Sequence, residues 1–177
     1  MVEKLHLIIN AFNTLQPLAT EIIALVAVLG IFNTRSLWKQ TNRPIVSAFV
    51  ETNSSGNIAT MFNLIIANTG NRPAIDVKLT IDNKEEFTEC IENSEHIMIK
   101  SIFRCFEDEA TIPLLINGET KSNSFGITSI KKEQNLWKYG SSFSITINYK
   151  DLEKNKYQSS LTLYIKNSED FADGSWS

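Results

Sequence analysis

An apolar stretch near the N-terminus constrains the fold of this chain more than any other part of its sequence. Residues 5–34 contain no Lys or Arg, and their single acidic side chain is Glu21. The part that begins at Leu18 reads LATEIIALVAVLGIF. Its extension to Trp38 gives about the 20 residues that a helix needs to cross a bilayer. We therefore expect residues 1–38 to form an interfacial and transmembrane helix.

The flanks of this stretch predict that the helix is retained, and they predict its orientation. The start of the chain is only weakly basic and no small-residue cleavage pattern follows, so the stretch does not read as a cleaved signal peptide. Lys4 precedes the apolar run, whereas Arg35, Lys39 and Arg43 follow it. Basic residues gather on the cytoplasmic side of membrane helices. The sequence therefore predicts a single-pass membrane protein whose C-terminal domain is cytoplasmic.

Pro17 leaves two arrangements open for the first half of the stretch. It either lies within one long helix as a kink, or it is the first-turn residue of the spanning helix. In the second case residues 5–16 lie along the membrane interface.

Polar residues in this first half recur at helical spacing. On a continuous helix they form one stripe, which favours helix–helix contacts, a pore lining and a homo-oligomer. The alternative is that Glu21 lies near the outer interface in contact with water. The stripe consists of His6, Asn10, Asn13, Pro17, Glu21 and Ala24.

Composition excludes several classes of function. The chain has 17 basic and 20 acidic residues, and 14 against 18 of them follow Lys39, so the remaining domain is mildly acidic. Binding of a nucleic acid polymer needs clustered positive charge. Cys90 and Cys105 are predicted to be unpaired thiols, although an oxidising compartment would let them pair. No metal set, nucleophile–base pair or phosphate-binding loop is present, so we expect no cofactor and no enzymatic activity.

The chain beyond a short linker, residues 39–42, alternates apolar and polar residues as β-strands do. Seven short strands in residues 43–166 predict a mainly β domain, an antiparallel immunoglobulin-like β-sandwich, with an open β-barrel as the alternative. Residues 167–177 read as a polar tail. The predicted strands are residues 43–52, 58–68, 74–82, 97–103, 120–128, 142–150 and 157–166, with residues 112–118 approaching a turn and residues 131–139 forming a loop or short helix.

Four motifs in this region resemble small bacterial proteins with an N-terminal membrane helix and an immunoglobulin-like β-sandwich. They are RP, IIANTGNRPAIDV, LLINGE and ITINYKDLEKNKY, where those proteins have RP, NTGNxPAxxV, LxPGE and YxDxxGxxY. The chain departs from this pattern at Ile116 and Asn117, where a Pro is preferred, and at Asn155, where Gly is preferred. The resemblance implies the sandwich fold and a location in a bacterial inner membrane.

The NTGNRPA motif has a structural interpretation. Asn68 and Asn71 can cap a turn with their side chains, Gly70 can supply a positive φ, and Pro73 fixes the chain before the next strand. A second candidate is the loop with Lys131, Lys132, Trp137 and Lys138, which could contact an anionic ligand or lipid headgroups, the alternative being a plain exposed loop.

Two functions agree with these features. The first is a membrane-anchored, non-enzymatic protein whose cytoplasmic sandwich binds a protein partner or a small ligand. The second is a membrane effector of antiviral defence, in which the β domain senses a signal and the striped helices oligomerise to disrupt the membrane.

Overall fold

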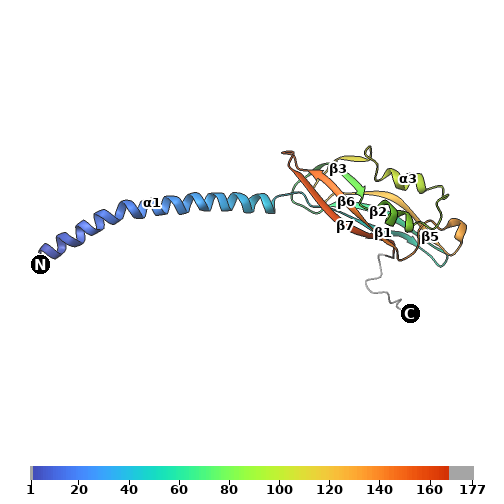
Figure 1. Ribbon diagram of the computed structural model, residues 1–177, viewed down its shortest axis with the longest axis horizontal. Coiled ribbons are helices and arrows are strands. Elements are labelled where there is room, and N and C mark those ends of the chain that lie inside the picture. Colours follow the sequence, from blue (N-terminus) through green and yellow to red (C-terminus); the bar gives the residue numbers. More distant parts are fainter. Residues whose placement is uncertain (1, 168–177) are drawn as a thin grey trace. The chain divides into compact units, whose positions relative to one another are not determined.

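The computed structural model describes the backbone of residues 2–167 and the side chains of Lys4 and residues 19–167. It divides into two compact units, Met1–Asn42 and Arg43–Ser177. The first unit contains helix α1, and the second contains all the strands (Figure 1). Each unit is considered separately below.

Helix α1 (Val2–Thr41) continues past Pro17, as in the first of the two arrangements predicted for the apolar stretch. Its segment Ala19–Thr41 has a mean hydropathy of 1.4 and is wholly exposed. The Thr34 and Thr41 hydroxyls donate to the carbonyl oxygens of Gly30 and Leu37, which satisfies them within the helix. This segment is long and apolar enough to span a membrane, a property that signal sequences share.

The second unit is an antiparallel β-sandwich, as the alternation of its sequence predicts. One sheet has the strand order β1-β2-β5 and the other has β4-β3-β6-β7, and neither closes into a barrel. In the constant immunoglobulin arrangement the fourth strand lies in the sheet of the first. Here it pairs with the third. The strands are β1 (Val46–Ser55), β2 (Ala59–Asn68), β3 (Ala74–Ile81), β4 (Thr111–Leu115), β5 (Thr120–Ser129), β6 (Ser142–Lys150) and β7 (Lys156–Tyr164).

The long connection between β3 and β4 differs from the prediction. Residues 97–103 were expected to form a strand, but the connection holds two short helices, α2 (Lys84–Glu89) and α3 (Ile99–Arg104). The apolar side chains of α3 follow helical spacing, with Ile102 fully buried. The actual fourth strand is β4, which contains Pro113 and lies at a sheet edge, where a missing N–H is tolerated.

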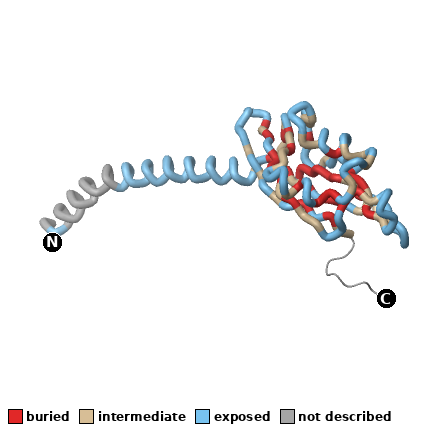
Figure 2. Tube along the Cα trace, turned by 45° about the vertical axis from the view of Figure 1, so that its right-hand side comes forward, coloured by how far each residue is buried: buried red, intermediate tan, exposed pale blue. Residues whose placement is uncertain are grey.

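The core lies between the two sheets, where Figure 2 shows the buried residues in red. An aromatic cluster fills it beneath α2. The Phe87 ring of that helix meets the rings of Phe143 and Trp137 edge to face, at centroid distances of 4.8 and 5.8 Å. Asn83 caps the same helix by accepting hydrogen bonds from the backbone N–H groups of Glu85 and Glu86.

Strand register places the loops of the sandwich at two ends. The chain enters at Arg43, and the loops 69–73, 116–119 and 151–155 lie at that same end, because Asn68 pairs with Val46 and Lys150 with Ile75. We call this the proximal end. The loops 56–58 and 130–141 form the opposite, distal end.

Candidate functional site

The sandwich is open on one side, between the edge strands β4 and β5. A cavity of about 400 Å³ lies there. Its floor consists of Leu64, Ile66 and Leu79, which belong to the hydrophobic core. On the opposite side of the sandwich β1 lies against β7. The cavity therefore lies where two strands with unpaired edges flank the core.

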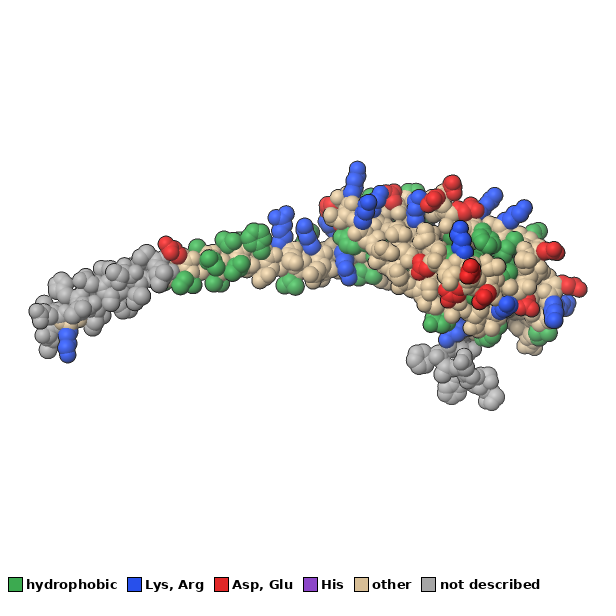
Figure 3. Space-filling view, in the orientation of Figure 1, with side chains coloured by type: hydrophobic (Ala, Val, Ile, Leu, Met, Phe, Trp, Pro, Cys, Tyr) green, Lys and Arg blue, Asp and Glu red, His purple; other side chains and the backbone are tan. Residues whose placement is uncertain are grey.

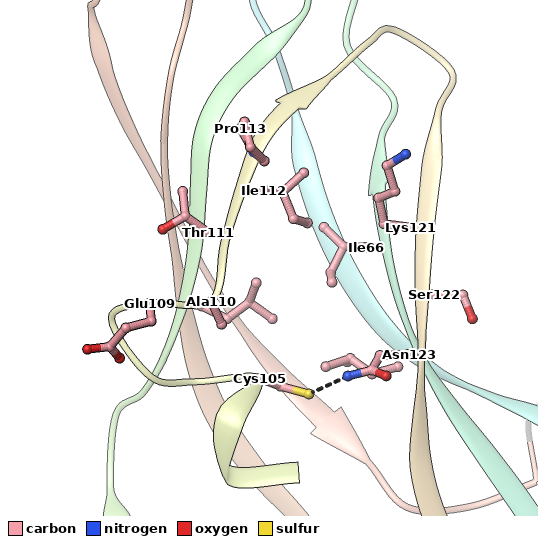
Figure 4. A pocket seen from close by; sticks show the side chains of 12 residues that line it. Ile66, Cys105, Glu109, Ala110, Thr111, Ile112, Pro113, Lys121, Ser122 and Asn123 are labelled. Carbon is pink, nitrogen blue, oxygen red and sulfur yellow. Dashed lines mark hydrogen bonds between the residues drawn. The ribbon is translucent and has the colours of Figure 1, made fainter. Parts of the chain in front are cut away.

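The rim of the cavity is polar. Ile66 and Ile112 extend toward each other across it, whereas the Glu109 carboxylate points away (Figure 4). The Asn123 side-chain amide donates a hydrogen bond of 2.9 Å to the Cys105 sulfur. Further polar side chains of the rim are those of Thr111, Lys121 and Ser122.

The lining of this cavity presents apolar surface, polar groups and a thiol. Burial raises the pKa of the Cys105 thiol, and this effect is larger than the lowering of the pKa by the hydrogen bond from Asn123. The sulfur is therefore a protonated thiol at neutral pH. Within residues 19–167 and Lys4, no three His, Cys, Asp or Glu side chains are grouped to hold a metal ion. A volume of this size and an apolar floor with a polar rim are typical of small-ligand sites.

No local pattern in the sequence predicts this cavity. Its lining comes from β2, β3, β4, β5 and the segment after α3, which are far apart in the chain. The available signal was Pro113, which marks an edge strand, beside the exposed polar run TKSNS of β5. Those two features indicate where sheet edges are free, but only the strand order puts both edges on one side.

Asn68 connects the proximal loops, which agrees with its predicted role in a turn. Its side-chain oxygen accepts hydrogen bonds from the backbone N–H groups of Ile45 and Gly70, at 3.2 and 3.1 Å. Its amide nitrogen donates to the carbonyl oxygens of Arg72 and Leu115, at 2.7 and 3.0 Å. Only 1% of Asn68 is exposed, so its side chain fixes three segments from inside the fold.

Of the other residues of this turn, Gly70 acts differently from the prediction. Gly70 does not have the positive φ expected of it; it is required because a Cβ there would meet the backbone of Arg43, Pro44 and Ile45. Asn71 is exposed, and Pro73 leads directly into β3. The motif is therefore a close backbone contact built around Asn68.

The β6–β7 turn is also held by a buried polar group. Asp151, which is 3% exposed, accepts hydrogen bonds from the Asn155 backbone and side chain and from the Tyr157 hydroxyl. Desolvation opposes its ionisation, but these hydrogen bonds outweigh it and hold the pKa of Asp151 below its usual range. Lys154 has the positive φ of this turn, at 65°. Asn155, which stands where the resembling proteins prefer Gly, therefore does not adopt the left-handed conformation that would require Gly.

The predicted basic site is only partly on the surface. Trp137 is completely buried, and its ring packs against Phe87, Phe125 and Phe143 in the core. Its Nε1–H donates to the carbonyl oxygen of Phe125. Trp137 therefore cannot contact a lipid or ligand, and that part of the prediction is wrong. Lys131, Lys132 and Lys138 are exposed at the distal end, away from Arg43.

The polar stripe of α1 falls mostly outside the described side chains, which exclude those of His6, Asn10, Asn13 and Pro17. The stripe's other members, Glu21 and Ala24, are exposed. A homo-oligomer through this helix stays a prediction.

Comparison with known proteins places the chain in one family. Residues 9–169 match the domain of unknown function DUF8453, so this protein belongs to that family. A search of curated proteins finds no match.

Proposed function

We propose that this protein is a single-pass protein of a bacterial inner membrane, anchored by α1, with its sandwich in the cytoplasm. The sandwich binds an apolar group of a protein partner or small ligand in the cavity between β4 and β5, without chemical conversion. The segment Ala19–Thr41 supports the anchor by its length, hydropathy and full exposure. Arg35, Lys39 and Arg43 after the apolar run support the cytoplasmic orientation.

The observation that carries the binding proposal is the cavity itself, which has an apolar floor of core residues and lies between two sheet edges. Leu64, Ile66 and Leu79 belong to the hydrophobic core and line the bottom of this cavity, where they are 0%, 8% and 3% exposed. Apolar surface in such a space gains free energy when a ligand excludes water from it. The unpaired backbone groups of β4 and β5 add hydrogen-bonding partners at the mouth, as in proteins that bind an extended segment at a sheet edge.

Photo-crosslinking in native membranes tests this proposal. A photoreactive amino acid at Ser122, on the cavity rim, should give one discrete adduct. The same residue at Thr162, which is exposed on β7 and remote from the cavity, should give none. The substitution Ile112→Trp places an indole across the cavity mouth and should abolish the Ser122 adduct while leaving the sandwich folded. Adducts that are identical at both positions, or that persist with Ile112→Trp, would contradict the proposal.

A further inference from the structure

We infer that the proximal end of the sandwich is a lipid-docking surface that rests on the anionic headgroups of the membrane. The occupant is the bilayer itself, recognised by exposed apolar side chains together with unpaired positive charge. This inference rests on the proposed membrane anchor, and it concerns how the domain is held once α1 is inserted.

The chain leaves little distance between the membrane span and this surface. Helix α1 and its candidate membrane span both end at Thr41, and the backbone N–H of Asn42 still donates to the Trp38 carbonyl oxygen, at 2.9 Å. The second unit begins at Arg43, and Pro44 is already buried in it. One extended residue spans at most about 3.6 Å. If the helix ends at the lipid headgroups, the proximal end therefore begins within a few ångströms of the headgroup layer.

Exposed apolar side chains are found in three of the proximal segments. Ile45 is 44% exposed at the chain entry, Ile116 is 49% exposed before the β4–β5 turn, and Leu152 is 58% exposed in the β6–β7 turn. Large apolar side chains at loop tips are costly in water and stable in the interfacial region of a bilayer. Figure 3 shows apolar side chains, in green, beside Lys and Arg, in blue, where the chain enters the sandwich.

The acidic side chains at this end, apart from the buried Asp151, are in ion pairs, which leaves several positive charges available. Glu153 forms an ion pair with Arg72 at 2.8 Å, and Glu119 pairs with Lys121. Among the described residues, no salt bridge involves the remaining exposed cations of this end. These cations are Arg43, Lys154 and Lys156. Such a set attracts anionic lipid, which is enriched in the cytoplasmic leaflet.

The surface is preformed. Asn68 connects the chain entry to the β2–β3 turn and to the end of β4, and the Arg72–Glu153 pair joins the β2–β3 turn to the β6–β7 turn. The buried Asp151 holds the β6–β7 turn in place. The exposed groups therefore reach lipid together and lose little conformational freedom on binding.

The distal end provides an internal comparison. Its loop also presents an exposed isoleucine, Ile130, beside Lys131 and Lys132, but the chain does not enter the sandwich there. The connection that leaves β3 at that end, residues 82–110, carries nine acidic and three basic side chains. Repulsion between this connection and an anionic surface favours contact through the proximal end.

Hydroxyl-radical footprinting of the full chain in lipid nanodiscs tests the docking. Two disc types are compared, one of phosphatidylcholine alone and one with equal parts of phosphatidylcholine and phosphatidylglycerol. Oxidation of Ile116 and Leu152 should fall about threefold or more in the anionic discs, because headgroups cover these side chains. Oxidation of Ile130 should be the same in both. The charge reversals Lys154→Glu and Lys156→Glu, made singly, should each restore oxidation, and Lys131→Glu should not.

The outcomes separate docking from anchoring. Equal oxidation of Leu152 in both disc types, in protein that is incorporated into discs, would overturn the docking and leave the anchor intact. Protection of Ile130 in place of Leu152 would overturn it as well. A chain that fails to incorporate into discs at all would remove the anchor, and with it the basis of the docking.

Discussion

Replacing Asn68 with alanine should lower the free energy of unfolding of the sandwich by about 3–5 kcal/mol, a large part of the total stability of a small domain. The substitution leaves the buried N–H group of Gly70 and the partly buried N–H group of Ile45 without this acceptor. It also removes the donor from the carbonyl oxygens of Arg72 and Leu115. Chemical denaturation of the full chain in mild detergent, followed by Trp137 fluorescence, measures the change.

Asn63→Ala is the matched control for this variant. Asn63 lies on the same strand, β2, but on the outer face of its sheet and only half-buried. Its replacement should change the free energy of unfolding by no more than about 0.5 kcal/mol. An Asn68→Ala domain as stable as the Asn63→Ala domain would show that the proximal loops hold together without the Asn68 side chain.

Trp137→Ala should be the second severe substitution, with a loss of about 3–5 kcal/mol. The indole is fully buried, its centroid lies 5.1 Å from that of Phe125, and its Nε1–H satisfies the Phe125 carbonyl. Trp137→Phe retains most of the packing but orphans that carbonyl, so it should cost about 1–3 kcal/mol. Unfolding followed by circular dichroism compares both with Trp38→Ala, an exposed position on α1 that should leave the sandwich unchanged. A small effect of Trp137→Ala would mean that the loop 130–141 does not close the core.

The sequence predicts those parts of the fold where local pattern and burial agree. β3 alternates strictly, and Val77 and Leu79 face the core as that pattern indicates. The prediction of a strand at residues 97–103 is wrong, because the apolar spacing of so short a segment fits a strand and a helix equally well. The burial of Ile102 in the core is what favours the helix. The interpretation of Gly70 fails for another reason. The close approach between Gly70 and the backbone of residues 43–45 is a tertiary contact, and no local sequence pattern predicts such a contact.

The candidate sites were less predictable than the fold. Trp137 lies between lysines in the sequence, which favours an exposed basic and aromatic loop, yet a single side chain of that loop turns inward to the aromatic cluster. The cavity depends on β4 pairing with β3 rather than with the first sheet, which leaves the edges of β4 and β5 on one side. Strand pairing is a long-range property, so neither Ile112 nor Ser122 could be assigned to a site from the sequence.

Membrane topology is the most direct test of the anchor that α1 is proposed to provide. The chain is expressed in bacteria with one epitope tag at each end, and spheroplasts are treated with protease from outside. The N-terminal tag should be digested, the C-terminal tag should survive, and the full-length chain should remain in the membrane pellet after alkaline carbonate extraction. Release of a shortened chain into the soluble fraction would identify the Ala19–Thr41 segment as a cleaved signal sequence. Digestion of the C-terminal tag from outside would place the sandwich on the outer side of the membrane. Either result would contradict the proposal of a membrane-anchored binding protein with a cytoplasmic sandwich.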